Sequence, residues 1–502
     1  MINRYQKLDK ALYIAAYLFF LIPASLFFIF WYKWYISIPV LCGLIFIFIR
    51  GISKIKLKKE KEYNEIFNIK KWIAVLLLLL GLNIISGTGG LSYQNGDHNA
   101  RNAVMHDLIE YDWPVKYEYT EEESKIIGFE NGYFSYYFAY WLPSAVVGKV
   151  FGFKAANLAL FVYQFVGLIL FYYFLSRYFN KVRIRYFFVF VAFSGLDAIG
   201  QILSDKKLFY STQHIDTWAG AFCFSSNITQ LFWVFNQGVS TWLIMSLLFN
   251  ETNFKNVGIY MLFLLLFAPF PAVGYAAMIF ILCIFGFYGF NKKNNGFLKN
   301  FIEFFSALNI ISVIIIGLLA FFLTVNAGSQ PKTLFLDHFP EGSITLAFYL
   351  KRYILFWVFE LGALIAIVIS KKNYKWVIAM TIFLSIIPFI YMGYGCDFSN
   401  RVSLAMLDVL MILLMEKVND FKFKNIGSIL IIVYLCISCI TPLCEINRTL
   451  KQNVYNIKNN VTMYSDNWKT YGKIDTEDVI IYIHNFSTEY KENKFVFKYI
   501  LK

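Results

Sequence analysis

The chain has 502 residues, of which 58% are hydrophobic and 20% aromatic, and its mean hydropathy is +0.55. Several apolar runs are long enough to cross a hydrocarbon layer of ~30 Å, so the composition excludes a soluble fold and predicts a polytopic α-helical membrane protein. The net charge of +14 arises from Lys and Arg residues in short loops between apolar runs, as in cytoplasmic loops. The positive charge therefore indicates membrane topology, and no nucleic-acid partner is expected.

The first three apolar runs set the expected orientation. Runs 11–30 and 36–49 are followed by segment 50–71, which carries seven lysines and is the most basic short segment of the chain. Because basic loops stay inside, this segment and the N-terminus are expected in the cytoplasm. Run 72–85 then leaves the cytoplasm, so the polar loop 88–132 is expected on the outer face of the plasma membrane.

The remaining apolar runs alternate across the membrane to give a tally of about thirteen spans. Segment 133–151 is aromatic and apolar, but counting it as a span would put the basic residues of 177–185 outside; we therefore expect a helix lying on the outer surface. Pro269 and Pro271 interrupt a pair of runs, and this turn is expected to face an outer cavity. Residues 1–441 thus form the membrane domain, and residues 442–502 a small outer tail with a few strands.

The outer loop 88–132 is the polar centre of the sequence. Between Thr88 and Gly132 it has nine acidic and three basic residues, whereas the whole chain is basic. Residues 97–110 are predicted to form a helix, with Asp97 placed soon after the third span. Ionised side chains are costly at a membrane helix centre, by ~2.5 to 3.5 kcal/mol, so these groups are expected to line a hydrated pocket.

Other charged residues fall on the same expected face of the membrane. Segment 332–341 contributes Asp337, His338 and Glu341. The candidate substrate- and phosphate-binding residues are His98, Arg101, His214, Asp216, Lys351, Arg352, Asp397 and Arg401.

A pocket holding both acids and bases suits the transfer of a sugar from a lipid phosphate. The attacking hydroxyl needs a carboxylate to accept its proton, and the departing phosphate needs cationic donors. Asp97 is the first candidate for the base and Asp107 the second. Arg401 is the first candidate for the phosphate, because a guanidinium can bind two phosphate oxygens at once.

Each candidate also has a structural interpretation. Asp97 is placed to cap the predicted helix, and Asp107 to support it. His214 and Asp216 fit a surface loop, while Arg401 fits a side chain that snorkels to the interface.

Metal and redox chemistry find little support in the spacing of residues. A divalent ion held by Asp97, His98 and His106 is an alternative, but no standard ligand spacing is present, and no metal ligand or cofactor is assigned. Cys436 and Cys439 have CxxC spacing inside an apolar run, which favours packing over redox chemistry.

The overall arrangement resembles the GT-C superfamily of polyprenyl-phosphate-sugar-dependent glycosyltransferases. The resemblance rests on the acidic residue after a span, the aromatic segment ending at Gly148–Gly152, the many spans and the outer tail. It implies a GT-C-like helical fold, an inverting transfer, and Asp97 as the catalytic base. Segments 94–117, 230–242 and 397–403 also resemble parts of uncharacterised bacterial polytopic membrane proteins.

The sequence thus favours a membrane glycosyltransferase of the cell envelope. Its donor would be a polyprenyl-phosphate sugar, and its acceptor a lipid, glycan or protein outside the cytoplasm. A transporter or flippase of lipid-linked glycans is the main alternative, supported by Asp197 and Glu360 within apolar runs. A polysaccharide polymerase or ligase would share the outer pocket and differ in its donor.

Overall fold

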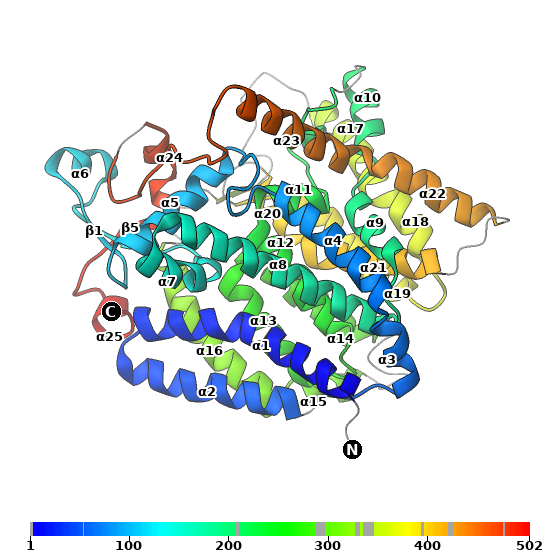
Figure 1. Cartoon of the computed structure of the whole chain (residues 1–502), viewed down its shortest axis with the longest axis horizontal. Helices are drawn as coiled ribbons and strands as arrows, with labels where there is room; N and C mark the ends of the chain where they lie inside the picture. The colour runs from blue at the N-terminus through cyan, green and yellow to red at the C-terminus, as the bar shows by residue number, and fades with distance from the viewer. Residues whose placement is uncertain are drawn as a thin grey trace.

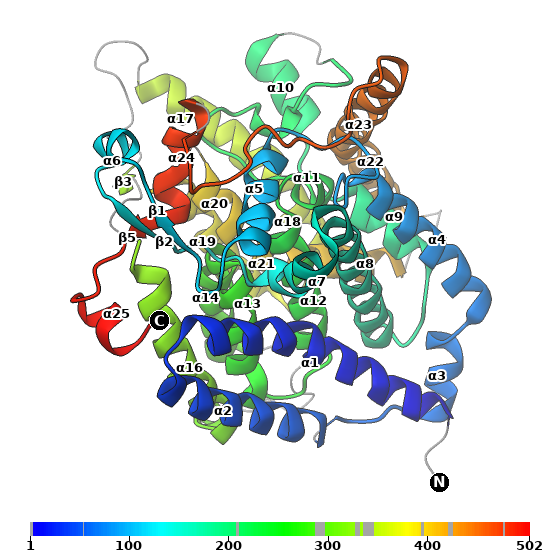
Figure 2. The same cartoon turned by 60° about the vertical axis from the view of Figure 1, so that its left-hand side comes forward.

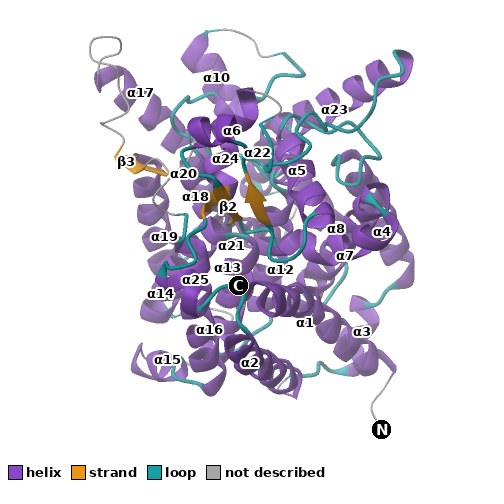
Figure 3. Cartoon of the chain, turned by 90° about the vertical axis from the view of Figure 1, so that its left-hand side faces the viewer, coloured by secondary structure: helices purple, strands orange, loops and turns teal. Residues whose placement is uncertain are grey.

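The chain folds into a helical body with few strands (Figures 1 and 3). The structure is a computed structural model that describes residues 4–53, 55–206, 210–286, 297–326, 332–334, 346–392, 396–419, 425–474 and 477–502. Of the predicted polar residues, Asp337, His338 and Glu341 lie outside the described residues.

Six helices or helix pairs among the described residues are long and apolar enough to cross a membrane. They are α1 (Arg4–Trp31), α2 (Trp34–Ser53), α8 (Phe153–Tyr178), α9 with α10 (Ile184–Ala192, Asp197–Asp205), α16 (Ala307–Thr324), and α22 with α23 (Ile426–Ser438, Ile440–Lys458). A seventh is formed if α3 (Glu60–Ile66) and α4 (Ile69–Ile85), which meet at 42°, count as one span.

Other apolar runs form shorter helices. These and the helices between them are α11 (Asn227–Trp233), α12 (Phe235–Leu248), α13 (Val257–Phe267), α14 (Pro269–Phe285), α15 (Phe297–Glu303), α17 (Leu346–Phe356), α18 (Ala363–Val368), α19 (Tyr374–Ile386) and α21 (Leu404–Asn419). The expected interruption near Pro269 is confirmed, because α13 ends at Phe267 and α14 begins at Pro269. The apolar segment 231–249 is likewise broken at Val234, between α11 and α12. The structure therefore shows a helical protein with several helices of spanning length, and the tally of about thirteen stays a prediction.

Segment 133–151, expected as one surface helix, is divided in the structure. Strand β2 covers Asn131–Phe134, the 3-10 turn η1 covers Ala139–Trp141, and helix α7 covers only Leu142–Phe151. A helix of this length extends about 15 Å, which is half of the hydrocarbon thickness. It ends at Gly152, whose φ of +83° turns the chain directly into α8. Helix α7 therefore packs against α8 and cannot cross a membrane.

The C-terminal residues pack against the loop that precedes α7 (Figure 2). Strand β5 (Ser487–Glu489) pairs antiparallel with β2, which pairs in turn with β1 (Lys116–Glu118). Helices α6 (Glu121–Ile127), α24 (Glu477–Phe486) and α25 (Phe495–Tyr499) flank this small sheet. Lys33 N donates to Ile500 O at 3.0 Å, so the α1–α2 turn lies at this same end of the helices.

The expected domain boundary at 441/442 falls inside a helix. Helix α23 follows α22 almost in line and includes Pro442 in its first turn, where a missing backbone N–H costs little (Figure 1). Its buried side contains Glu445, Thr449 and Asn456, and it contacts α10 and α11. The C-terminal segment is therefore continuous with the helical body up to Lys458.

Candidate functional site

A cavity of about 700 Å³ lies where the helical body meets the C-terminal segments. One wall is the start of α5 (Asp97–Glu110), whose bounds agree with the helix predicted from the sequence. The opposite charged wall is the short helix α20 (Asp397–Val402). Pro269 and Phe270 line it as well, so the interrupted α13–α14 turn faces a cavity as expected.

The two charged walls carry the same motif, an acidic residue followed four positions later by arginine. Asp97 Oδ2 lies 3.3 Å from Arg101 Nη2, and Asp397 Oδ1 lies 2.9 Å from Arg401 Nη2. All four residues line the cavity, although some 300 positions of sequence separate the two pairs. Residues at i and i+4 share a helix face, so each arginine is held by the carboxylate one turn before it.

The arginines are buried more deeply than the acids that hold them. The side chains of Arg101 and Arg401 are 12% and 14% exposed, against 44% and 37% for Asp97 and Asp397. Arg101 Nη1 is buried without a hydrogen-bond partner among the described residues, and the guanidinium lies 5.7 Å from the Phe235 ring centre. The Arg101 guanidinium therefore has a donor that the described residues leave unused.

Tyr137 links Arg401 to helix α12. Its hydroxyl accepts from Arg401 Nη1 at 3.2 Å and from Gln237 Nε2 at 3.0 Å. Gln237 is buried on α12, and its Oε1 has no hydrogen-bond partner in the described part of the chain. An unpaired, buried acceptor thus lies next to the contact between Tyr137 and Arg401.

Aromatic side chains from distant segments complete the cavity. Tyr136 packs against Phe486 of α24 with ring centres 4.3 Å apart, and Trp468 packs against Tyr482 with ring centres 5.1 Å apart. Of Trp113, Tyr136 and Trp141, Tyr136 lines this cavity and the other two do not. Trp113 packs against Trp31, and Trp141 is 1% exposed.

Asp107 faces away from the cavity and binds the tail. Its carboxylate accepts from the Thr470 hydroxyl, from Tyr117 OH at 2.6 Å and from Tyr471 N at 3.0 Å. Burial raises the pKa of Asp107 to about 7, although these hydrogen bonds act in the opposite direction. This residue therefore anchors the C-terminal segment to α5.

The two histidines of α5 also lie apart from the cavity. His98 is 2% exposed and stacks on Phe235, and burial lowers its pKa to about 3. His106 Nε2 lies 3.1 Å from Asp466 Oδ1. Asp97, His98 and His106 thus do not converge, and the described residues contain no group of three His, Cys, Asp or Glu side chains placed to hold a metal ion. Asp97 is the first helical residue of α5, with Gly96 as the N-cap.

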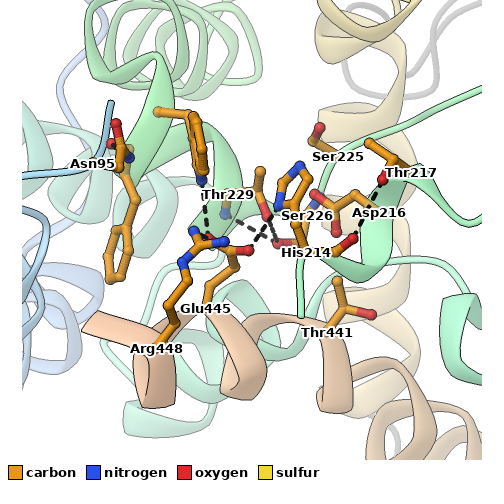
Figure 4. A network of polar contacts seen from close by, with 12 residues as sticks. Asn95, His214, Asp216, Thr217, Ser225, Ser226, Thr229, Thr441, Glu445 and Arg448 are labelled. Atoms are coloured by element: carbon orange, nitrogen blue, oxygen red, sulfur yellow. Dashed lines mark hydrogen bonds and ion pairs between the residues drawn. The ribbon is translucent and has the colours of Figure 1, made fainter. Parts of the chain in front are cut away.

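His214 and Asp216 belong to a second polar cluster, shown in Figure 4. His214 Nδ1 lies 2.8 Å from Glu445 Oε1, while the other Glu445 oxygen accepts from Trp233 Nε1 at 2.9 Å and pairs with Arg448. Burial lowers the pKa of His214, but the hydrogen bond to Glu445 and the negative charges of Asp216 and Glu445 together outweigh it, so the pKa is raised overall. Burial raises the pKa of Asp216 to about 7.

Two further buried acids lie beside this cluster. Asp197 Oδ2 accepts from Ser194 Oγ at 2.6 Å and from Thr441 Oγ1 at 2.7 Å. Glu360, in the π-helical turn η5 (Trp357–Gly362), accepts from Trp218 Nε1 at 3.0 Å and contacts Asp197. The structure thereby brings the two acids of the apolar runs together.

The remaining basic candidates lie elsewhere. Arg352 Nη2 pairs with Asp205 Oδ1 at 2.9 Å, and neither Lys351 nor Arg352 lines the cavity. The predicted residues that line it are Asp97, Arg101, Asp397 and Arg401.

Sequence reasoning missed the cavity residues of the tail. The lining residues of the tail are Trp468, Tyr482, Asn485 and Phe486. Outside the tail, Tyr137 accepts a hydrogen bond from Arg401 and another from Gln237. The only local signal for the tail was the density of Tyr, Trp and Asn in a polar segment. Comparison of the chain with protein-family models, curated proteins and solved structures gave no match.

Proposed function

We propose that the protein is a membrane glycosyltransferase that uses a polyprenyl-phosphate sugar and acts in the cavity between α5 and α20. The observation that carries the proposal is the convergence of two Asp–Arg pairs and aromatic rings on one cavity of about 700 Å³. A volume of this size suits a ligand with one or a few sugar rings.

The residues divide into roles by exposure and charge. Asp97, the more exposed acid, is the proposed general base for the acceptor hydroxyl. Arg401 and Arg101 are the proposed donors to the leaving phosphate, since both guanidinium groups are buried at the cavity wall. Tyr136, Trp468 and Tyr482 offer ring faces to a sugar.

During the transfer, Asp97 accepts the proton of the acceptor hydroxyl, and the arginines bind the negative charge of the departing phosphate. As the acceptor oxygen attacks the anomeric carbon, Asp97 takes its proton, and the bond to the phosphate oxygen breaks. The leaving phosphate is then stabilised by the arginines. When phosphate binds Arg101, the Asp97 carboxylate loses its ion-pair partner and is free to accept the proton.

The test is release of labelled polyprenyl phosphate from a panel of polyprenyl-phosphate sugars by purified protein in lipid. Asp97→Asn should lower turnover by about 10²–10⁴-fold, the range for a general base. Glu121→Gln is the matched control, because Glu121 is an exposed acid of the same loop that pairs with Lys125. No turnover on any donor, or full turnover by Asp97→Asn, would contradict the proposal.

A flippase of lipid-linked glycans is a second candidate, favoured by one observation. The contact of Asp197 with Glu360, buried at 0% and 4% exposure, is a paired-acid arrangement that the transferase does not use. A flippase would lose glycan movement between leaflets in Asp197→Asn, whereas a transferase would keep its turnover in that variant if the fold is retained.

A further inference from the structure

Two cysteines lie on two neighbouring chain segments that are far apart in sequence. Cys223 is in the loop between α10 and α11, and Cys396 directly precedes α20. Hydrogen bonds on both sides hold the two segments together. Tyr391 OH donates to Ala221 O at 3.0 Å on one side, and Ser225 N donates to Asn400 Oδ1 at 2.9 Å on the other.

The two cysteines lie between these flanking hydrogen bonds, and their thiol groups are close together. Asn400 Nδ2 also donates to Ser225 Oγ at 2.8 Å, so the Ser225–Asn400 contact is doubled. The thiol groups of Cys223 and Cys396 then lie in contact, close enough to interact as a hydrogen-bonded pair. Both are free thiols here, and Cys223 is buried whereas Cys396 is partly exposed.

We propose that Cys223 and Cys396 form a disulfide that ties α20 to the loop between α10 and α11. On the orientation expected from the basic loops, both segments face the extracytoplasmic side, where disulfides form and persist. The flanking hydrogen bonds of Tyr391 and Asn400 keep the two segments adjacent, and the two thiol groups are already in contact.

The two cysteines have different parts in forming the bond. The hydrogen bond from Cys223 lowers the pKa of Cys396, and its partial exposure makes it the thiol that a reagent reaches first. With glutathione disulfide as oxidant, the Cys396 thiolate attacks one glutathione sulfur and releases one glutathione. Cys223 then loses its proton and attacks the Cys396 sulfur of the mixed disulfide, which releases the second glutathione. Two thiols are thereby oxidised and one glutathione disulfide is reduced.

The bond would fix the charged wall of the main cavity. Cys396 is the N-cap of α20, whose next residue is Asp397 and whose last turn carries Arg401. The proposal does not depend on the glycosyltransferase assignment, because it requires only this packing and an oxidising face.

The experiment counts reactive thiols in the full-length protein in detergent. The wild-type chain is equilibrated with glutathione disulfide, quenched in acid, unfolded and labelled with a maleimide polymer. We expect two fewer labelled thiols than the seven that label after dithiothreitol, and a peptide linking Cys223 to Cys396 by mass spectrometry. In the Cys223→Ser variant the disulfide cannot form. At most one label should then be missing, because Cys396 can still carry a glutathione adduct.

Cys436 and Cys439 provide the internal control. They are also close together, since Cys439 Sγ donates to Cys436 O at 3.1 Å, but they lie on one apolar helix. The double variant Cys436→Ser/Cys439→Ser should lose the same two labels as wild type. Labelling of all seven wild-type thiols, a peptide linking Cys436 to Cys439 instead, or a glutathione adduct on Cys396 with Cys223 still free would each overturn the proposal.

Discussion

Arg401 makes two polar contacts at the cavity wall. Its Nη2 donates to Asp397 and its Nη1 donates to Tyr137. The negative charge of Asp97 also attracts the guanidinium. A lysine has the same charge but lacks the planar fork, so it cannot make both contacts and bind phosphate.

We therefore predict that Arg401→Lys lowers kcat/KM for a polyprenyl-phosphate sugar by about tenfold or more, and that Arg401→Gln lowers it by about 10²-fold or more. Arg352→Gln is the control, because Arg352 pairs with Asp205 outside the cavity. Equal activity of the Lys and Gln variants with wild type would remove Arg401 from the phosphate site.

Asp107 makes the docking of the tail dependent on pH. Its pKa is raised to about 7 by burial, so the folded protein retains a proton that the unfolded chain loses near pH 4. The proton on Asp107 therefore stabilises the folded protein by an amount on the order of 4 kcal/mol. This stabilisation is fully present below pH 4 and is lost as the pH rises through 7.

We predict that proteolysis of residues 459–502 becomes faster as the pH is raised from 5 to 8. Asp107→Asn should remove most of this dependence, because the amide keeps an acceptor for Tyr117 and Tyr471 and can donate to Thr470. Asp112→Asn, at an exposed position of the same loop, should behave as wild type. An unchanged pH profile in Asp107→Asn would show that another group controls docking.

At the scale of elements, the position of α20 depends on its close contact with α14. A Cβ added at Gly274 of α14 would lie 1.8 Å from the carbonyl oxygen of Val402, the last residue of α20. No side chain fits this space without moving backbone, so Gly274 lets α20 carry Asp397 and Arg401 to the cavity.

Gly274→Ala is expected to lower the free energy of unfolding by about 1–3 kcal/mol and to reduce activity, since overpacking displaces α20. Gly317→Ala is the matched control, because a Cβ at Gly317 of α16 would meet nothing within 4 Å. Thermal unfolding in detergent measures both. Equal midpoints for the two variants would show that α20 tolerates the shift.

For the whole molecule, the site lies at one end of the helices. The α1–α2 turn, β1, β2, β5 and α24 gather at that end, while α3 and the N-terminus lie at the other (Figure 1). The basic segment around α3 predicts that the second end faces the cytoplasm.

An impermeant maleimide added to intact cells should therefore label Lys125→Cys and leave Lys61→Cys unlabelled until the membrane is opened. Both positions are exposed, so accessibility of the side chain alone does not separate them. Labelling is measured as the increase over wild type. The opposite pattern would invert the orientation and place the cavity on the cytoplasmic side.

The sequence by itself determined the helical class, the break at Pro269 and helix α5, because hydrophobic runs, proline and helix spacing act locally. It also identified Asp97, Arg101, Asp397 and Arg401, since charged residues in so apolar a chain are rare. It ranked Asp97 above Asp107, but it did not show that Asp107 binds the tail or place His214 and Asp216 in their own cluster.

The tertiary structure decided those points and brought Trp468 and Tyr482 of the tail to the cavity. It also divided segment 133–151, because β2 pairs with β5, more than 350 positions later. Such contacts join segments that share no local periodicity, and each depends on how all the intervening helices pack. Only the folded chain therefore shows which acid faces the cavity and which one binds the tail.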